Sequence, residues 1–326
     1  MHFFNKTSIS VNDAFWYIKE ENAWWDQFSK EHLSITGAFR ENMCDTEQTA
    51  IAAALMARYM LSKQAKSEYA DTIERALYND VLCVAADNLP KEETRYPMPE
   101  LFAESIYSTE GSVLYTHLYV GNQAELLVNG EKIQYYVTTA YPWDETVTVH
   151  MKRIRNTELT VAFRLPGWCR DYAVLVNGEC AVGTIEDGYV YITDTFAEET
   201  TFTLCFEMPV RVLRNHGVNG AYVGKVAVMR GPVVYCVQRD IHESEPYRLF
   251  LDTESEAVLT EVILEDFRKE CQAILMSGFR LKEDIYEEAY SFEREEYYEQ
   301  KQLLLVPYYI CGKQDETEKI VWINRI

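Results

Sequence analysis

The segment Glu41–Leu61, ENMCDTEQTAIAAALMARYML, places one thiol and three carboxylates within its first seven residues. Thiolates and carboxylates are common metal ligands, and a carboxyl group can also act as a general acid. The segment is therefore a candidate active or metal site, and Asp45 and Glu47 are two of its carboxylates. Cys44 could join them, but one thiol with two carboxylates and no histidine is an incomplete set for zinc.

The same carboxylates have a structural explanation, and it is the one that the sequence favours. Asp45 precedes an apolar-periodic run and Gln48 follows three residues later, which is the pattern of a helix N-cap and capping box. Glu47 falls in the first helical turn, where the helix dipole favours a negative charge. Capping and metal binding both remain open for Asp45 and Glu47.

The cysteines give no sign of a disulfide framework or a zinc knuckle. Eight are scattered along the chain without a C-x-x-C pair. Cys83, Cys205 and Cys236 lie in apolar periodic runs, so we expect them to pack as small hydrophobic residues.

Two histidines and two tryptophans complete the set of candidates. His117 and His150 are predicted to lie on the polar face of their strands, without a partner recognisable in sequence. Trp143 and Trp168 follow turn residues and could stack on a sugar, although closing a sandwich edge is the commoner role for such residues.

The elements that carry these residues change character along the chain. Apolar spacing of three to four residues predicts helices over about 11–30, 45–61 and 66–85. Beyond a proline-rich stretch the spacing becomes two, and Asn129-Gly130, Asn177-Gly178 and Asp187-Gly188 are predicted hairpin turns. Val223–Gln238 is predicted to form two strands about Gly231-Pro232.

We therefore predict a multidomain α+β protein. Its helices occupy residues 1–112, an antiparallel β-sandwich follows over 113–240, and a second, smaller β-sandwich spans 241–326.

Composition limits the partners. The chain has 31 basic and 52 acidic residues and a net charge of −21, so nucleic acid and anionic membranes are expected to be repelled. No window of the sequence is predicted to span a membrane, and we expect a cytoplasmic protein.

Several strings in fixed order carry a family resemblance. They are YADTIERALYNDVL (69–82), YTHLYVGNQA (115–124), YPWDETVTV (141–149), FRLPGWC (163–169), VAVMRGPVVYCVQ (226–238) and LLLVPYYICGK with IVWI (303–323). The chain from about Ser34 onward resembles the glycoside hydrolase family of the bacterial β-L-arabinofuranosidases, formerly a domain of unknown function. The resemblance implies an (α/α) toroid followed by two β-sandwich domains. It also implies an L-arabinofuranoside-type carbohydrate as partner.

The resemblance further implies a zinc-held cysteine as nucleophile and a glutamate as acid/base. The family's Glu-Thr-Cys falls on Asp45-Thr46-Glu47, so Asp45 could replace the glutamate ligand while Glu47 replaces a cysteine. The family's cysteine pair has no counterpart between 80 and 105, where Cys83 is the sole thiol. The acid/base glutamate is unmatched, with Glu41 the nearest carboxylate. The catalytic residues are therefore unassigned, and zinc is expected from the family but left open here.

Two hypotheses follow. The first is a glycoside hydrolase of non-reducing-end β-L-arabinofuranosides that is shortened in its toroid or inactive. The second is a non-catalytic carbohydrate-binding or scaffold protein of the same family. Uncovered helix faces of a partial toroid would favour a homo-oligomer.

Overall fold

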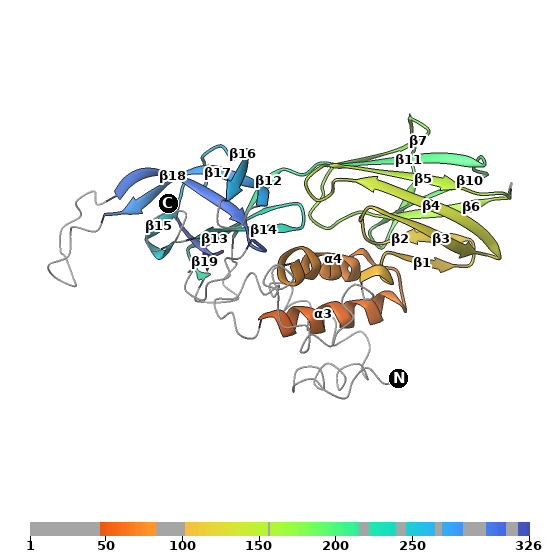
Figure 1. The fold of residues 1–326 in the computed structure, drawn as a ribbon, viewed down its shortest axis with the longest axis horizontal. Helices are drawn as coiled ribbons and strands as arrows, with labels where there is room; N and C mark the ends of the chain where they lie inside the picture. Colours follow the sequence, from red (N-terminus) through yellow and green to blue (C-terminus); the bar gives the residue numbers. More distant parts are fainter. Residues whose placement is uncertain are drawn as a thin grey trace.

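The computed structural model describes residues 46–82, 102–155, 157–214, 222–238, 246–264, 269–282, 298–310 and 319–326. These residues form a short helical layer and three β-sheets, so this part of the chain is mostly β (Figure 1). No helix in these ranges combines the length and apolar character that a membrane crossing requires.

The helical layer consists of α3 (Thr46–Leu61) and α4 (Ser67–Arg75), and α4 continues as the π-helical segment η3 (Ala76–Val81). In α4 the buried residues Tyr69, Ala70, Ile73 and Glu74 lie at helical spacing, which explains the amphipathic pattern of this stretch. These elements confirm the second and third predicted helices. The first, over about 11–30, lies outside the described residues.

The next strands form two facing sheets. Their bounds are β1 (Tyr107–Glu110), β2 (Val113–Thr116), β3 (Asn122–Val128), β4 (Glu131–Thr139), β5 (Thr146–Lys152), β6 (Leu159–Arg164), β7 (Tyr172–Val176), β8 (Glu179–Cys180), β9 (Thr184–Glu186), β10 (Tyr189–Asp194) and β11 (Glu199–Phe206). One sheet has the order β1-β2-β6-β10-β9 and the other has the order β3-β4-β5-β11-β7-β8. Every pair is antiparallel except β2 with β6. Apolar side chains from both sheets share one core, so these strands form a sandwich.

The predicted hairpin turns are confirmed. Asn129-Gly130 joins β3 to β4, Asn177-Gly178 joins β7 to β8, and Asp187-Gly188 joins β9 to β10. All six residues have positive φ angles, between 47° and 87°. A two-residue turn with both central φ angles positive matches the twist of the strands that it connects.

The remaining strands form a third sheet. Their bounds are β12 (Val210–Arg214), β13 (Lys225–Arg230), β14 (Val233–Gln238), β15 (Leu249–Leu251), β16 (Val258–Leu264), β17 (Lys269–Leu281), β18 (Tyr298–Pro307), β19 (Lys319–Ile320) and β20 (Ile323–Arg325), with the short 3-10 helix η5 (Pro246–Arg248) before β15. The order runs β12-β13-β20-β15-β17-β18-β14-β19, with β16 paired to β17. Because β13 also pairs directly with β14, the path from β13 through β20, β15, β17, β18 and β14 returns to β13. The sheet therefore closes on itself.

Closure of this sheet explains its burial pattern. Val226 and Val228 of β13 belong to one core cluster, whereas Ala227 and Met229 belong to another. Both faces of the strand are thus covered, one by the interior of the closed sheet. The predicted pair of strands about Gly231-Pro232 is present as β13 and β14.

The boundary between the two β units differs from the predicted division near residue 240. By strand pairing, Val210–Gln238 belongs with the strands that follow it and not with those that precede it. The period-two pattern identified these strands but held no information about their partners. The partners lie up to about a hundred residues later in the chain, as in the pairing of Lys225 with Asn324.

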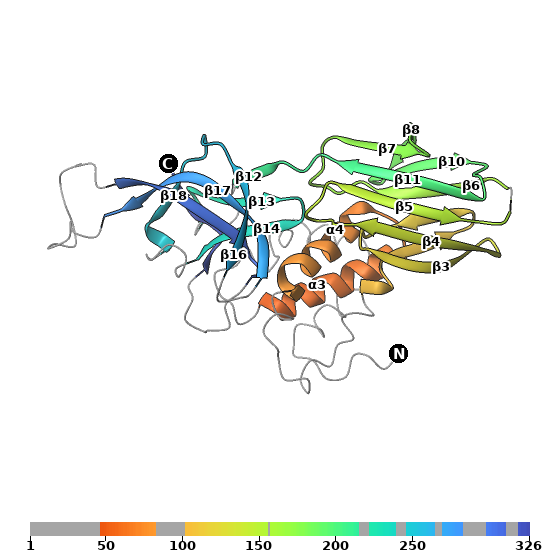
Figure 2. The ribbon, with the colours of Figure 1, turned by 45° about the horizontal axis from the view of Figure 1, so that its top comes forward.

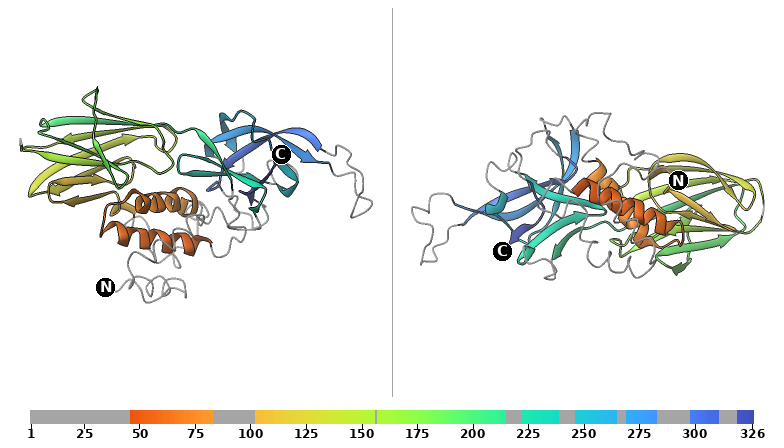
Figure 3. Two further views of the ribbon diagram at one scale, coloured as in Figure 1. Left: turned by 180° about the vertical axis from the view of Figure 1, so that it is seen from behind. Right: turned by 90° about the horizontal axis from the view of Figure 1, so that it is seen from below.

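The helical layer lies beneath the junction of the two β units. Figure 2 shows α3 and α4 side by side below the sandwich, with their ends directed toward the third sheet. Seen from below, the two helices cross from one unit to the other (Figure 3). This position brings polar side chains of α4 against the loop after β6 and Asn79 of η3 against the turn between β13 and β14.

Candidate functional site

The predicted metal site falls largely outside the described residues. Asp45, Cys44 and Cys83 are beyond them, and Glu47 lies in the first turn of α3 with a side chain that is not described. Among the described residues, no group of three or more histidine, cysteine, aspartate or glutamate side chains is arranged to hold a metal ion. The described part therefore supplies no zinc donor set, and the pairing of Asp45 with Glu47 stays a prediction.

The structure instead brings together a buried ionic cluster between α4 and the sandwich. Arg164, at the end of β6, is fully buried and donates to Asp71 and Glu74, which lie three residues apart on one face of α4. Its Nε donates to the backbone carbonyl of His117. Every nitrogen of this guanidinium thus has an acceptor, as a buried charge requires.

The cluster extends to the loop after β6. Gly167 donates its backbone N–H to Asp71 Oδ2 at 3.0 Å, and Trp168 Nε1 lies 3.4 Å from Glu74 Oε2. Tyr141 Oη donates to Glu74 Oε1 at 2.7 Å. A Cβ on Gly167 would lie 2.6 Å from Asp71 Oδ2, so the close approach of this loop to α4 requires glycine.

Burial and the opposite charges within the cluster shift the pKa values of its members. Burial alone would lower the pKa of Arg164, but Glu74 and Asp71 raise it well above its usual value. Burial raises the pKa of Asp71, and the Arg164 guanidinium opposes that rise. Burial also raises the pKa of Tyr141 far above its usual value, so the phenol remains a hydrogen-bond donor. Both carboxylates accept hydrogen bonds from fixed donors, which suits them to hold α4 against the sandwich.

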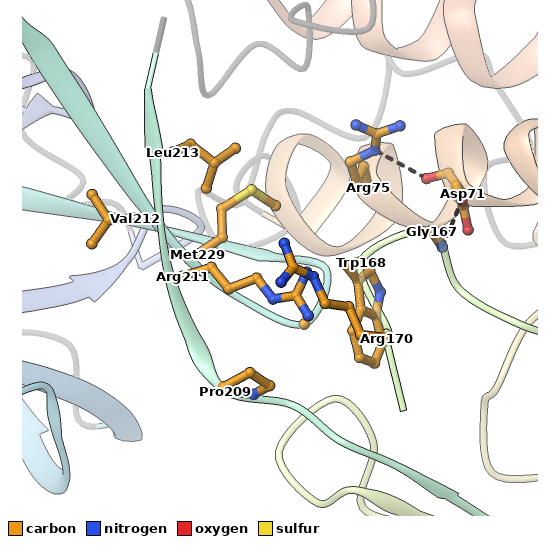
Figure 4. A pocket seen from close by; sticks show the side chains of 11 residues that line it. Asp71, Arg75, Gly167, Trp168, Arg170, Pro209, Arg211, Val212, Leu213 and Met229 are labelled. Carbon is orange, nitrogen blue, oxygen red and sulfur yellow. Dashed lines mark hydrogen bonds between the residues drawn. The ribbon is translucent and has the colours of Figure 1, made fainter. Parts of the chain in front are cut away.

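A cavity of about 450 Å³ opens beside this cluster. It is lined by Asp71 and Arg75 of α4, by Gly167, Trp168 and Arg170 of the loop after β6, and by Pro209, Arg211, Val212, Leu213, Met229 and Gly231 of the third sheet (Figure 4). Its volume is in the range of small-molecule sites. Among the described residues, its walls hold one acidic and three basic side chains, an arrangement that is suited to a polar or anionic group.

Two predictions about individual residues can be compared with the structure. His150 is exposed on β5, as predicted, and contacts Thr201 at 3.1 Å. The prediction for His117 was wrong: it is 1% exposed and contacts Ser108 and Tyr189 at 2.8 and 2.7 Å. The alternation fails because His117 follows the end of β2, in a segment where every residue from Leu114 to Tyr119 is buried.

The remaining candidates take structural positions. Cys236 is fully buried in the third sheet, as predicted, whereas Cys205 is only partly buried. Trp168 packs against Tyr141 and Phe206 at 6.2 Å between ring centroids, and Trp143 packs against Tyr309 at 6.0 Å. Trp168 also lines the cavity, and its stacking on a sugar stays a prediction.

Sequence reasoning missed Arg164, Asp71 and Glu74. Two signals could have found them. An arginine stands inside an apolar strand at FRLPGWC, and two carboxylates share the inward face of the helix YADTIERALYN. A charge on a buried face needs a partner, and these strings supply both signs.

Comparisons with known proteins agree with this architecture. A model described as β-L-arabinofuranosidase, GH127 middle domain, matches residues 113–208, and the glycoside hydrolase family 127 C-terminal domain matches residues 210–324. A curated non-reducing-end β-L-arabinofuranosidase from Bifidobacterium longum subsp. longum is 28% identical over 230 residues, covering 58% of this chain and 34% of that protein.

Solved structures resemble the chain over nearly its whole length. A GH127 β-L-arabinofuranosidase from Geobacillus stearothermophilus T6 superposes with a TM-score of 0.81 at 24% identity, covering 97% of this chain and 59% of that one. A second GH127 β-arabinofuranosidase gives 0.77 at 21% identity, covering 97% and 60%. At such identity the likeness shows the fold.

The chain spans about a third of the curated relative and about three fifths of these two structures. The two family models meet between residues 208 and 210, at the same place where strand pairing separates the sandwich from the third sheet. By its consecutive middle and C-terminal domains, the chain is a member of glycoside hydrolase family 127.

Proposed function

We propose that this protein is a carbohydrate-binding relative of the β-L-arabinofuranosidases that does not hydrolyse glycosides by the thiolate route. The observation that carries the proposal is the interval between α4 and β2. It contains Cys83 as its sole cysteine, where the resemblance expects the pair that includes the nucleophile. A retaining glycosidase needs a nucleophile and an acid/base group together, and neither is matched in this sequence.

The described architecture supports a positioning role for the helices. We infer that α3 and α4 belong to an (α/α) toroid, of which residues 1–112 hold a part. Their likeness to GH127 structures over 97% of this chain supports this assignment. The ionic cluster fastens α4 to the sandwich, so the helical layer has one fixed orientation relative to the β units.

The experiment is hydrolysis of an aryl β-L-arabinofuranoside, combined with zinc measurement by mass spectrometry on the same purified protein. We expect no turnover above buffer and less than one zinc per chain. Turnover accompanied by stoichiometric zinc would overturn the proposal.

The alternative is an active arabinofuranosidase whose metal is held by Asp45 and Glu47. The family assignment and the place of Glu47 in the first turn of α3 favour it. In that case Asp45→Asn and Glu47→Gln should each abolish zinc binding and turnover. Glu110→Gln, at an exposed position on β1, is the matched control and should retain both. If Asp45 and Glu47 only cap α3, both variants will lower thermal stability without changing bound metal.

The expectations about partners and location remain proposals. We propose a cytoplasmic protein with a furanoside-type ligand, with no nucleic-acid or membrane partner and with a capacity for homo-oligomer formation. The net charge of −21 supports the exclusion of polyanions. A single monomeric species in analytical sedimentation across micromolar concentrations would contradict the proposed homo-oligomer.

A further inference from the structure

The described wall of the cavity holds more basic than acidic side chains. Asp71, the one acidic residue among the described lining residues, already accepts from Arg164 and from the N–H of Gly167. The guanidinium groups of Arg170 and Arg211 have no hydrogen-bond or ion-pair partner in the described ranges. Two guanidinium groups are therefore available to a ligand of this cavity, as far as the described residues show.

These arginines come from separate parts of the chain. Arg170 follows β6 in the sandwich, whereas Arg211 lies on β12 of the third sheet. In Figure 4 their side chains extend from opposite walls toward the same part of the cavity, beside Trp168. The repulsion between two like charges directed at one space is relieved when an anion lies between them.

The neighbouring carboxylates are not part of the wall. Asp171, Glu207 and Arg211 all act on the thiol of Cys169, whose pKa burial raises to about 11. Neither Asp171 nor Glu207 is among the residues that line the cavity. In a protein with a net charge of −21, a wall with three arginines and one aspartate among its described residues is an exception to the overall charge.

The apolar residues of the cavity wall indicate what the uncharged part of the ligand is. The half-buried indole of Trp168 and the side chains of Pro209 and Met229 provide apolar surface next to the arginines. An aromatic face of this kind packs against the C–H face of a sugar ring, while guanidinium groups bind carboxylate or phosphate in a bidentate manner. The volume of about 450 Å³ accommodates a ligand of that size.

We propose that this cavity binds a small polyol that carries an oxyanion, such as a uronate or a sugar phosphate, between Arg170 and Arg211. The proposal does not depend on whether the protein hydrolyses arabinofuranosides. The cavity joins the two β units, since each of them contributes one arginine.

The test is isothermal titration of the purified protein with D-glucuronate, D-glucose 6-phosphate, inorganic phosphate and neutral D-glucose. We expect the two anionic sugars to bind and glucose not to bind. Their affinity should fall as sodium chloride is raised, because salt screens the half-exposed guanidinium groups. The stronger of the two anionic sugars identifies the oxyanion that the site prefers. Phosphate that binds as tightly as both would overturn the part of the proposal that assigns the sugar.

Matched variants locate the site. Arg170→Gln and Arg211→Gln should each weaken binding by about tenfold or more, because each removes a charged hydrogen-bond donor. Arg155→Gln is the control, since Arg155 is exposed near the β3–β4 turn and does not line the cavity. Circular dichroism and thermal melting confirm that all three variants are folded. Absence of binding by every anion at millimolar concentration would overturn the proposal, as would equal binding by all three variants and the wild type.

Discussion

Arg164 is the most deeply buried cation of the α4 interface; its partner Glu74 is buried with it, and its partner Asp71 is 12% exposed. Replacing it with methionine keeps much of the side-chain volume but leaves Asp71 and Glu74 without their cation. We expect Arg164→Met to lower the free energy of unfolding by roughly 3–5 kcal/mol, the usual cost of breaking a buried ion pair from one side. Urea denaturation followed by circular dichroism measures the change.

The control for this variant is an ion pair at the surface. Lys152 contacts Glu199 at 2.8 Å, and both side chains are at least half exposed. Lys152→Met should change stability by less than about 1 kcal/mol. Similar losses for Lys152→Met and Arg164→Met would contradict the structural role of the buried cluster.

His117 gives the fold a dependence on pH. Burial lowers its pKa to about 3 from an ordinary value of 6.5, and Arg164 adds to the effect. Between these values the unfolded chain binds a proton that the folded chain does not, so stability is retained above pH 6.5 and is lost as the pH falls toward 3. The expected slope from this residue is about 1.4 kcal/mol per pH unit.

The measurement is urea denaturation of His117→Gln and of wild type at several pH values from 7 to 4. The variant should be less stable at pH 7 but should lose less stability on acidification. His150→Gln is the matched control, because His150 is exposed and its removal should leave the wild-type slope intact. An unchanged slope in His117→Gln would contradict the assignment of this titration.

At the residue scale, the sequence predicted what local chemistry determines. Asn and Gly dipeptides identified the hairpin turns, since positive φ angles are a property of those residues. It did not predict the burial of Arg164 or His117. Alternation along a strand identifies the polar face of a sheet only where that face meets water; α4 covers Arg164, and His117 lies beyond the end of β2 against Ser108 and Tyr189.

At the scale of elements, the turn between β9 and β10 also contacts the start of α4. Ser67 donates its backbone N–H to the carbonyl of Asp187 at 2.9 Å, and Gln64 donates to the Asp187 carboxylate at 3.1 Å. A Cβ built on Gly188 would lie 2.0 Å from Ser67 Oγ. The missing side chain of Gly188 therefore permits the first turn of α4 to lie against the sandwich.

Two glycine variants separate these effects. Gly188→Ala should suffer both the strain of its φ of +77° and the clash with Ser67, whereas Gly178→Ala has a φ of +87° and nothing within 4 Å. We expect a loss of about 1–2 kcal/mol for Gly178→Ala, from backbone strain alone. Gly188→Ala should lose a further ~1–3 kcal/mol from overpacking. Equal losses in thermal or urea denaturation would show that α4 does not rest on this turn.

The sequence predicted the existence of most elements but not how the third sheet closes. Helical spacing located α3 and α4, and apolar alternation located β13 and β14. The pairing of β13 with β20 joins residues about a hundred positions apart, and no periodicity within either strand specifies that contact. The cavity between Arg170 and Arg211 depends on this long-range arrangement as well, which is why sequence alone did not indicate it.

Across the whole molecule, the helical layer is bonded to both β units. Asn79 in η3 is fully buried and accepts from the N–H of Val234 at 2.8 Å while donating to the carbonyl of Pro232 at 2.9 Å. Arg164 makes the corresponding connection to the sandwich. Arg230 of β13 adds a direct link, since it lies 3.4 Å from the carbonyls of Pro142 and Trp143.

Asn79→Ala tests whether this connection stabilises one unit or both. The substitution leaves the N–H of Val234 and the carbonyl of Pro232 buried without their partner, at a cost of roughly 1–3 kcal/mol for each group. Hydrogen exchange should show loss of protection at Val234 and along β13 and β14, while amides that pair β5 with β11 keep theirs. Asn324→Ala is the control, because Asn324 bonds to the Tyr247 carbonyl within the third sheet and makes no such link to α4 or η3 among the described residues. If Asn79→Ala lowers protection equally in the sandwich and the third sheet, the two units unfold as one, and the helical layer stabilises the molecule as a whole and not the third sheet alone.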